Sequence, residues 1–172
     1  LRKGDGVAFM CRTSYQWDIF DAAVMACGGV LATIYDTDSA EQIRNIVNNS
    51  DARLLVVETK DMRDKADGAE DECPTLEHIV CFENGGLDEI KAYGSVVSDE
   101  ELDERIDSVH KTDLCSIVYT SGSTAAPKGV EMTEEMLDKR YARIAELRSK
   151  ELQLEQELSE LNKKPVPELT MD

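Results

Sequence analysis

Short apolar runs alternate with helix-like segments along most of the chain. The runs are bounded by turn-forming residues and lie about one helix apart. We expect strands over residues 6–11, 30–35, 52–57, 78–82 and 114–119. Strands that alternate with helices form βαβ units, in which the strands run parallel and the helices cover the sheet. The pattern therefore predicts an α/β fold with a mostly parallel sheet and flanking helices.

Two amphipathic helices are predicted between the first three strands. The first begins after Ser14, ends at Gly28-Gly29, and buries a face formed by Trp17, Phe20, Val24 and Cys27. The second begins after Asp38 or Ser39 and buries Ile43, Ile46 and Val47. The stretch Asn48-Asn49-Ser50 matches a glycosylation acceptor. Because no secretory signal is visible, we interpret it as the end of the second helix.

The character of the sequence changes after Thr133. Residues 134–164 contain neither Gly nor Pro, and their apolar positions follow a seven-residue repeat interrupted by Arg140 and Glu151. This pattern predicts a long amphipathic helix, which either forms a coiled coil with a second copy or packs on its own sheet. We therefore divide the chain into an α/β body over residues 1–133, the helix over 134–164, and a loose tail over 165–172.

The chain of 172 residues carries a formal net charge of -17. Residues 67–74 are interpreted as an exposed acidic connection, and residues 98–107 as a capped surface helix with solvated charges. A surface of this sign repels nucleic acid and anionic membranes, so we expect neither as a partner. The longest apolar run, 22–35, is short for a membrane span and contains two glycines, so no transmembrane segment is predicted.

The five cysteines are odd in number, and most lie in apolar segments. This favours reduced, buried thiols in a cytoplasmic protein. Cys73, His78 and Cys81 are of the types that bind zinc, but no second pair of ligands accompanies them. We therefore predict no metal site.

The stretch "YTSGSTAAPKGV", residues 119–130, directly follows the last predicted strand. Its hydroxyl side chains, the backbone freedom of Gly122 and the charge of Lys128 together suit a polyphosphate. It is not the G-x-x-x-x-G-K loop, because Gly129 follows the lysine and neither Ser nor Thr comes next. On spacing alone, the alternative is a surface turn rich in Ser, Thr and Gly.

The longer stretch "YTSGSTAAPKGVEMT" resembles the phosphate-loop signature of the adenylate-forming (AMP-binding) superfamily. That signature has Tyr or Phe, then T-S-G, two Ser or Thr residues, and G-x-P-K-G-V. The preceding sequence, from "KGDGVAFMCRTSYQWDIF" to "DARLLVVET", is similar to the early N-terminal domain of long-chain fatty acyl-CoA synthetases. The resemblance covers about residues 1–133, and it implies a partial N-terminal subdomain of such an enzyme.

The resemblance implies a two-step ligase reaction. A fatty acid attacks ATP to give acyl-adenylate, and coenzyme A then displaces AMP to give acyl-CoA, with Mg2+ accompanying ATP. The positions that match the motif would bind the ATP phosphates, namely Thr120, Ser121, Gly122, Ser123, Thr124 and Lys128. Their role would be positioning and charge neutralisation, so no catalytic residue is assigned.

The chain departs from the family pattern in three respects. Ala125 replaces a glycine, and Glu134 replaces a histidine that commonly follows Thr133. The adenine pocket, the fatty-acid tunnel and the C-terminal domain of the family have no counterpart, and the chain begins at Leu1, inside the family domain. We therefore expect a ligase fragment that is inactive alone. The alternatives are an interaction protein that forms a homodimer through residues 134–164, and a stand-alone nucleotide binder.

Overall fold

The computed structural model describes residues 1–120 and 127–162. It divides into two compact units, Leu1–Glu134 and Glu135–Asp172. Four of the predicted phosphate-binding residues, Ser121, Gly122, Ser123 and Thr124, lie outside the described residues, and so does Ala125.

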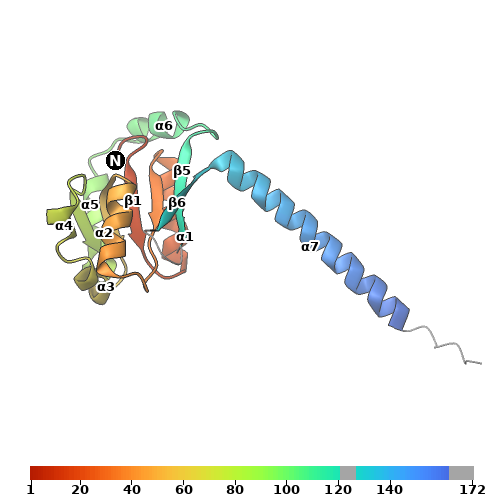
Figure 1. Cartoon of the computed structure of the whole chain (residues 1–172). Helices are drawn as coiled ribbons and strands as arrows, with labels where there is room; N and C mark the ends of the chain where they lie inside the picture. Colours follow the sequence, from red (N-terminus) through yellow and green to blue (C-terminus); the bar gives the residue numbers. More distant parts are fainter. Residues whose placement is uncertain (121–126, 163–172) are drawn as a thin grey trace, which may run out of the picture. The chain divides into compact units, whose positions relative to one another are not determined.

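A six-stranded sheet forms the centre of the first unit, in the order β4-β3-β1-β2-β5-β6 (Figure 1). The strands are β1 Gly6–Met10, β2 Val30–Thr33, β3 Ala52–Val57, β4 His78–Cys81, β5 Leu114–Thr120 and β6 Lys128–Thr133. The first five run parallel to their neighbours, whereas β6 is antiparallel to β5. The predicted mostly parallel sheet is therefore confirmed. The sequence pattern did not predict β6, because residues 128–133 are largely exposed and form no apolar run.

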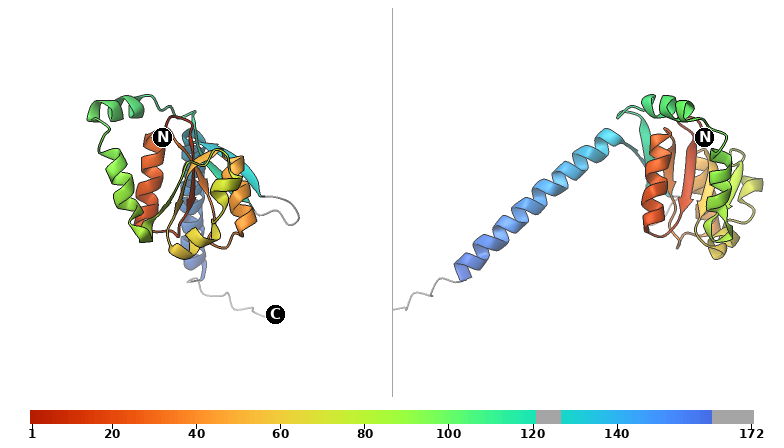
Figure 2. Two further views of the ribbon diagram at one scale, coloured as in Figure 1. Left: turned by 90° about the vertical axis from the view of Figure 1, so that its left-hand side faces the viewer. Right: turned by 180° about the vertical axis from the view of Figure 1, so that it is seen from behind.

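Helices cover both faces of this sheet (Figure 2). The helices of the first unit are α1 Tyr15–Ala26, α2 Ala40–Asn49, α3 Lys60–Lys65, α4 Ala69–Glu72, α5 Gly86–Gly94 and α6 Asp99–Asp107, with a 3-10 turn at Phe82–Asn84. One face carries α1 and α5, and the other carries α2, α3 and α4. The helices therefore sandwich the sheet, as the βαβ pattern requires.

Side-chain caps fix where the two predicted helices begin. The Ser14 hydroxyl accepts a hydrogen bond from the Trp17 amide, at 3.3 Å. Ser39, rather than Asp38, caps α2, and it forms a reciprocal pair of hydrogen bonds with Gln42. The α2 helix ends at Asn49, so the interpretation of this stretch as a helix end is confirmed.

The core lies on both faces of β1, all five residues of which are buried. On the α1 face, the Phe9 and Phe20 rings stack with their centroids 4.6 Å apart, and Val24 packs with them. On the other face, the apolar residues of α2 pack against alternate strand residues such as Leu55 and Ile117. A central strand buried on both faces explains why β1 reads as a continuous apolar run.

The two acidic stretches differ in how they are built. Residues Asp99–Asp107 form the expected surface helix, with Ser98 as its cap, and none of its residues is buried. The interpretation of residues 67–74 as a simple exposed connection is incomplete. This stretch contains the short helix α4, and Ala69 and Cys73 are fully buried beneath its exposed acidic side chains.

The helix α7, Glu134–Asn162, begins directly after β6. Ion pairs one turn apart stabilise it, with Lys139–Glu135 at 2.6 Å and Lys150–Glu146 at 2.7 Å. Among the leucines of the predicted repeat, Leu154 and Leu158 are exposed. The coiled coil stays a prediction, and the tail over 165–172 lies outside the described residues. No helix within the described ranges is long and apolar enough to cross a membrane.

Candidate functional site

The carboxyl ends of the parallel strands define one edge of the sheet. In α/β sheets ligands bind outside this edge, where successive strands connect to helices on opposite faces. Two such neighbours are β1, which leads into α1, and β3, which leads into α3 on the other face. The segment of the predicted phosphate loop leaves the sheet at the same edge, because β5 is parallel to β2 and β2 to β1.

Thr120 and Lys128 lie directly opposite each other at the ends of β5 and β6. Both are exposed. Side chains alternate along strands, and directly paired residues share a face, so their side chains lie on the same side of the hairpin. A hydroxyl and a full positive charge thus flank the predicted phosphate loop. The phosphate-binding role of these two residues stays a prediction.

The preceding residue, Tyr119, is buried at the base of the hairpin. Its hydroxyl donates a hydrogen bond to the Asn49 side-chain oxygen at the end of α2, at 2.8 Å. Burial raises the pKa of the Tyr119 phenol, which keeps it protonated and able to donate at neutral pH. No local sequence pattern predicts this contact, because Asn49 lies 70 residues from Tyr119.

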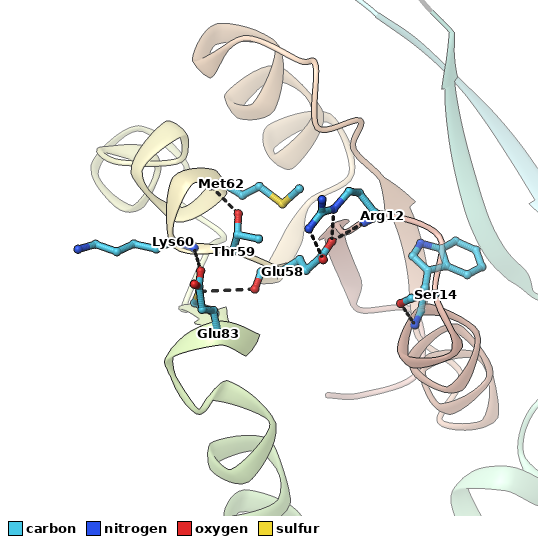
Figure 3. A network of polar contacts seen from close by, with 9 residues as sticks. Arg12, Ser14, Glu58, Thr59, Lys60, Met62 and Glu83 are labelled. Carbon is cyan, nitrogen blue, oxygen red and sulfur yellow. Dashed lines mark hydrogen bonds and ion pairs between the residues drawn. The ribbon is translucent and has the colours of Figure 1, made fainter.

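An ion pair bridges the ends of β1 and β3, where the chain leaves the sheet toward opposite faces (Figure 3). The Arg12 guanidinium donates to both carboxylate oxygens of Glu58, at 2.7 and 3.1 Å, and the Arg12 amide donates to the same carboxylate at 2.9 Å. Three donors from one residue hold the pKa of the Glu58 carboxyl below its usual value. The sequence pattern did not predict this pair, whose members lie 46 residues apart.

Glu83 joins the end of β4 to this network (Figure 3). Its carboxylate accepts from the Lys60 amide at 2.7 Å, and its own amide donates to the Glu58 carbonyl at 3.0 Å. The loops after β1, β3 and β4 are therefore tied together by polar contacts. These contacts hold the three loops together at the carboxyl edge of the sheet.

Two hollows lie along this edge on either side of Thr59. One, of about 540 Å3, is lined mainly by charged side chains, including Arg12, Asp36, Lys60, Asp61, Lys65 and Glu83. The other, of about 360 Å3, is lined by Cys11, Ser14, Gln16, Glu58, Phe82 and Leu87, among others. Within the smaller hollow, burial and then the Glu58 charge raise the pKa of the Cys11 thiol to about 12. Cys11 is therefore not an activated nucleophile.

A further hollow, of about 490 Å3, is mostly apolar and lies at the amino ends of β3 and β4. Its central charge is Arg53, which pairs with Asp5 and Glu77. No predicted site residue lines it. The two ion pairs of Arg53 connect the amino ends of β3 and β4 to the turn before β1.

The cysteines and histidines form no metal centre among residues 1–120 and 127–162, where no group of three metal-binding side chains gathers. Cys73 and Cys81 are buried, whereas His78 is exposed beside the Tyr93 ring. All five cysteines are free thiols.

The chain belongs to the AMP-binding enzyme family, whose family model matches residues 1–159. The match extends beyond residue 133, where the resemblance in sequence was expected to end. The predicted resemblance to this superfamily is therefore confirmed.

Curated relatives are long-chain fatty acid–CoA ligases. The chain is 34% identical over 140 residues to the long-chain-fatty-acid–CoA ligase FadD15 of Mycobacterium bovis, an alignment that covers 80% of this chain and 23% of that ligase. It is 30% identical over 144 residues to ACSBG2 of Xenopus laevis, covering 78% of this chain and 20% of that ligase. The chain thus spans less than a quarter of the length of these relatives.

Solved structures show the same fold. The anthranilate CoA ligase AuaEII in complex with anthranoyl-AMP aligns with a TM-score of 0.60 at 22% identity, covering 78% of this chain and 25% of that one. The N-terminal domain of FACL13 from Mycobacterium tuberculosis aligns with a TM-score of 0.57 at 22% identity, covering 78% and 32%. The predicted fold, the N-terminal part of an adenylate-forming enzyme, is confirmed.

Proposed function

We propose that this chain carries the phosphate-binding part of a long-chain fatty acid–CoA ligase. The observation that carries the proposal is the exposed pair Thr120 and Lys128 at the carboxyl edge of the sheet, inside the sequence motif of the family. The similarity to the FadD15 and ACSBG2 ligases supports the substrate class. ATP is the expected ligand of this chain, and a long-chain fatty acid and coenzyme A are the expected substrates of the complete enzyme.

In the proposed reaction, a fatty-acid carboxylate attacks the α-phosphorus of ATP and releases pyrophosphate. The coenzyme A thiol then attacks the acyl carbon of the acyl-adenylate and releases AMP. Lys128 would neutralise charge on the β- and γ-phosphates, and Thr120 would offer its hydroxyl to a phosphate oxygen. These groups suit the task because both lie exposed at the mouth of the hairpin. Mg2+ would arrive with ATP, as part of the substrate.

We further propose that the chain by itself binds ATP without completing the ligase reaction. Its alignments with the FadD15 and ACSBG2 ligases span 23% and 20% of the length of those proteins. An acyl-transfer site needs a carboxylate pocket and charge stabilisation around the reacting carbon, in addition to a phosphate loop. Residues 119–130 supply only the phosphate loop.

Two measurements test the proposal. Calorimetric titration with ATP and Mg2+ should show binding that Lys128→Ala weakens about tenfold or more, since hydrogen bonds to charged groups are the stronger class. Lys91→Ala, which removes an exposed lysine from α5, should leave the affinity unchanged. ATP–pyrophosphate exchange with palmitate should show no turnover. Absence of ATP binding, or binding independent of Lys128, contradicts the phosphate-binding role, and clear turnover contradicts the proposed inactivity.

Self-association through α7 is a second, separate proposal. It is supported by the exposure of Leu154 and Leu158, which lie four residues apart and so on one helix face. Sedimentation velocity at two protein concentrations should show a dimer that dissociates on dilution. A monomer at every concentration contradicts it, and Leu154→Glu should abolish any dimer that forms through this face.

A further inference from the structure

We propose that Asn49 is a positioning residue for the phosphate-binding hairpin. It acts through Tyr119, which it holds from the end of α2, and so fixes the orientation in which Thr120 and Lys128 face the ligand. The inference rests on the proposed function of the hairpin. No local sequence pattern points to Asn49, which lies in a different βαβ unit from the motif.

The alternation of side chains along β5 places Tyr119 where it can make this contact. Ile117 and Tyr119 lie on the face of the sheet that α2 covers, and both belong to the same buried cluster as Val47 of α2. The Tyr119 ring is 3% exposed, yet its hydroxyl reaches the surface end of α2 and donates to Asn49. The ring therefore spans the distance from the core to an acceptor on another element. Rotation of this part of β5 would break that hydrogen bond.

Gly129 has no side chain, and this leaves room for the Tyr119 ring beside it. It is paired directly with Tyr119 across the hairpin. A Cβ atom there would lie 2.8 Å from Ile117 Cγ2, 3.2 Å from Tyr119 Cε1 and 3.3 Å from Asn49 Oδ1. Because Gly129 has no side chain, Tyr119 and Asn49 can both lie close to the β6 backbone while they form their hydrogen bond. Glycine at this position is required for space, and the contact fixes both strands of the hairpin together.

The face of the hairpin that carries Tyr119 determines which side chains lie on its opposite face. Thr120 and Lys128 follow and precede the Tyr119–Gly129 pair by one residue, so their side chains lie on the opposite side. A one-residue slip between β5 and β6 would exchange the two faces and turn Lys128 toward the core. Because β6 is the edge strand, it pairs only with β5, and the contact between Tyr119 and Asn49 adds to the interactions that oppose such a slip. The Asn49–Tyr119 hydrogen bond therefore stabilises the register that exposes the lysine.

The acceptor itself stands on a rigid element. Three residues of α2 are buried to 1% exposure or less: Ile43, Ile46 and Val47. A capping box at Ser39 closes the start of the helix. At its end the Ser50 hydroxyl donates to the Ile46 carbonyl at 2.7 Å. Asn49 thus offers a fixed oxygen, which a positioning contact needs.

The test uses the full chain, four single variants and the double variant that combines Asn49→Ala with Tyr119→Phe. Asn49→Ala removes the acceptor, Tyr119→Phe removes the donor but keeps the ring, and Asn49→Asp restores an acceptor oxygen. Asn45→Ala is the matched control, since Asn45 is exposed on the same helix. Each is measured by ATP titration with Mg2+ and by amide hydrogen exchange of residues 128–133, with residues 52–57 of β3 as an internal reference.

Asn49→Ala and Tyr119→Phe should each weaken ATP binding and speed exchange in residues 128–133 about fivefold, the size expected for one lost hydrogen bond. Exchange in β3 should not change. Asn49→Asp should restore both readouts, and the double variant should lose no more than either single variant.

Wild-type exchange rates in Asn49→Ala overturn the inference, whether or not the chain binds ATP. If exchange changes while ATP binding does not, the positioning role is overturned. If wild-type chain fails to bind ATP, the proposed function fails, and exchange alone decides whether Asn49 orders the hairpin.

Discussion

Arg12 donates to Glu58 from both its guanidinium and its backbone amide, which joins the ends of β1 and β3. These donors lower the pKa of the Glu58 carboxyl. A lowered folded-state pKa stabilises the protein above the ordinary glutamate value of about 4.3, and this stability is lost as pH falls through the lowered pKa. Arg12→Ala should therefore slightly reduce the free energy of unfolding at pH 7, because ion pairs between exposed groups contribute little to stability.

The pH dependence separates this ion pair from general packing. Urea unfolding at pH 7 and in acid should show the difference between wild type and Arg12→Ala shrinking as Glu58 becomes protonated. Lys91→Ala, which removes an exposed partner 4.0 Å from Asp88, should change stability less at every pH. A difference that persists unchanged in acid would mean that Arg12 acts through its aliphatic stem rather than its charge.

Gly129→Ala should destabilise the body by about 1–3 kcal/mol, because the added methyl overpacks the base of the hairpin. The methyl would meet Ile117 and the Tyr119 ring within 3.2 Å. The comparison is Gly94→Ala, where a Cβ meets nothing within 4 Å and the helix α5 gains a better helix former. Thermal and urea unfolding of both variants measure the effect. Equal stability of the two variants would contradict the close packing at Gly129.

Cys11 should react slowly with alkylating reagents. Its pKa of about 12 leaves very little thiolate at pH 8, and the thiolate is the reactive form. Mass-spectrometric mapping after iodoacetamide treatment should show alkylation at least about tenfold slower than for a free cysteine thiol, whose pKa is about 8.5. Because the Glu58 charge contributes to the raised pKa, Glu58→Gln should speed the reaction. Labelling at the rate of free cysteine would contradict the burial of this thiol.

The division of the chain into a body and a helix can be tested by truncation. A chain that ends at residue 134 should unfold cooperatively in urea at the same midpoint as the full chain, because residues 1–134 form a compact unit with their own core. Circular dichroism should show only the loss of helical signal. A lower midpoint would mean that residues beyond 134 stabilise the body.

Local rules predicted the parallel strands and the starts of their helices. The apolar run 52–57 matches β3, and Ser14 and Ser39 cap α1 and α2. These features depend on residues close in sequence, through burial, alternation and capping. By contrast, α5 and β6 were missed. The α5 helix begins at glycines, which favour no helix, and β6 is an exposed edge strand that derives its order from pairing with β5.

The sequence by itself determined the family, the parallel sheet and the motif with Thr120 and Lys128, because these depend on residue order and local periodicity. The tertiary structure alone decided the strand order β4-β3-β1-β2-β5-β6. That order brings Arg12 to Glu58, 46 residues away, and Tyr119 to Asn49, 70 residues away. Such contacts follow from how helices cross the sheet and which edges meet, and no local pattern records that geometry.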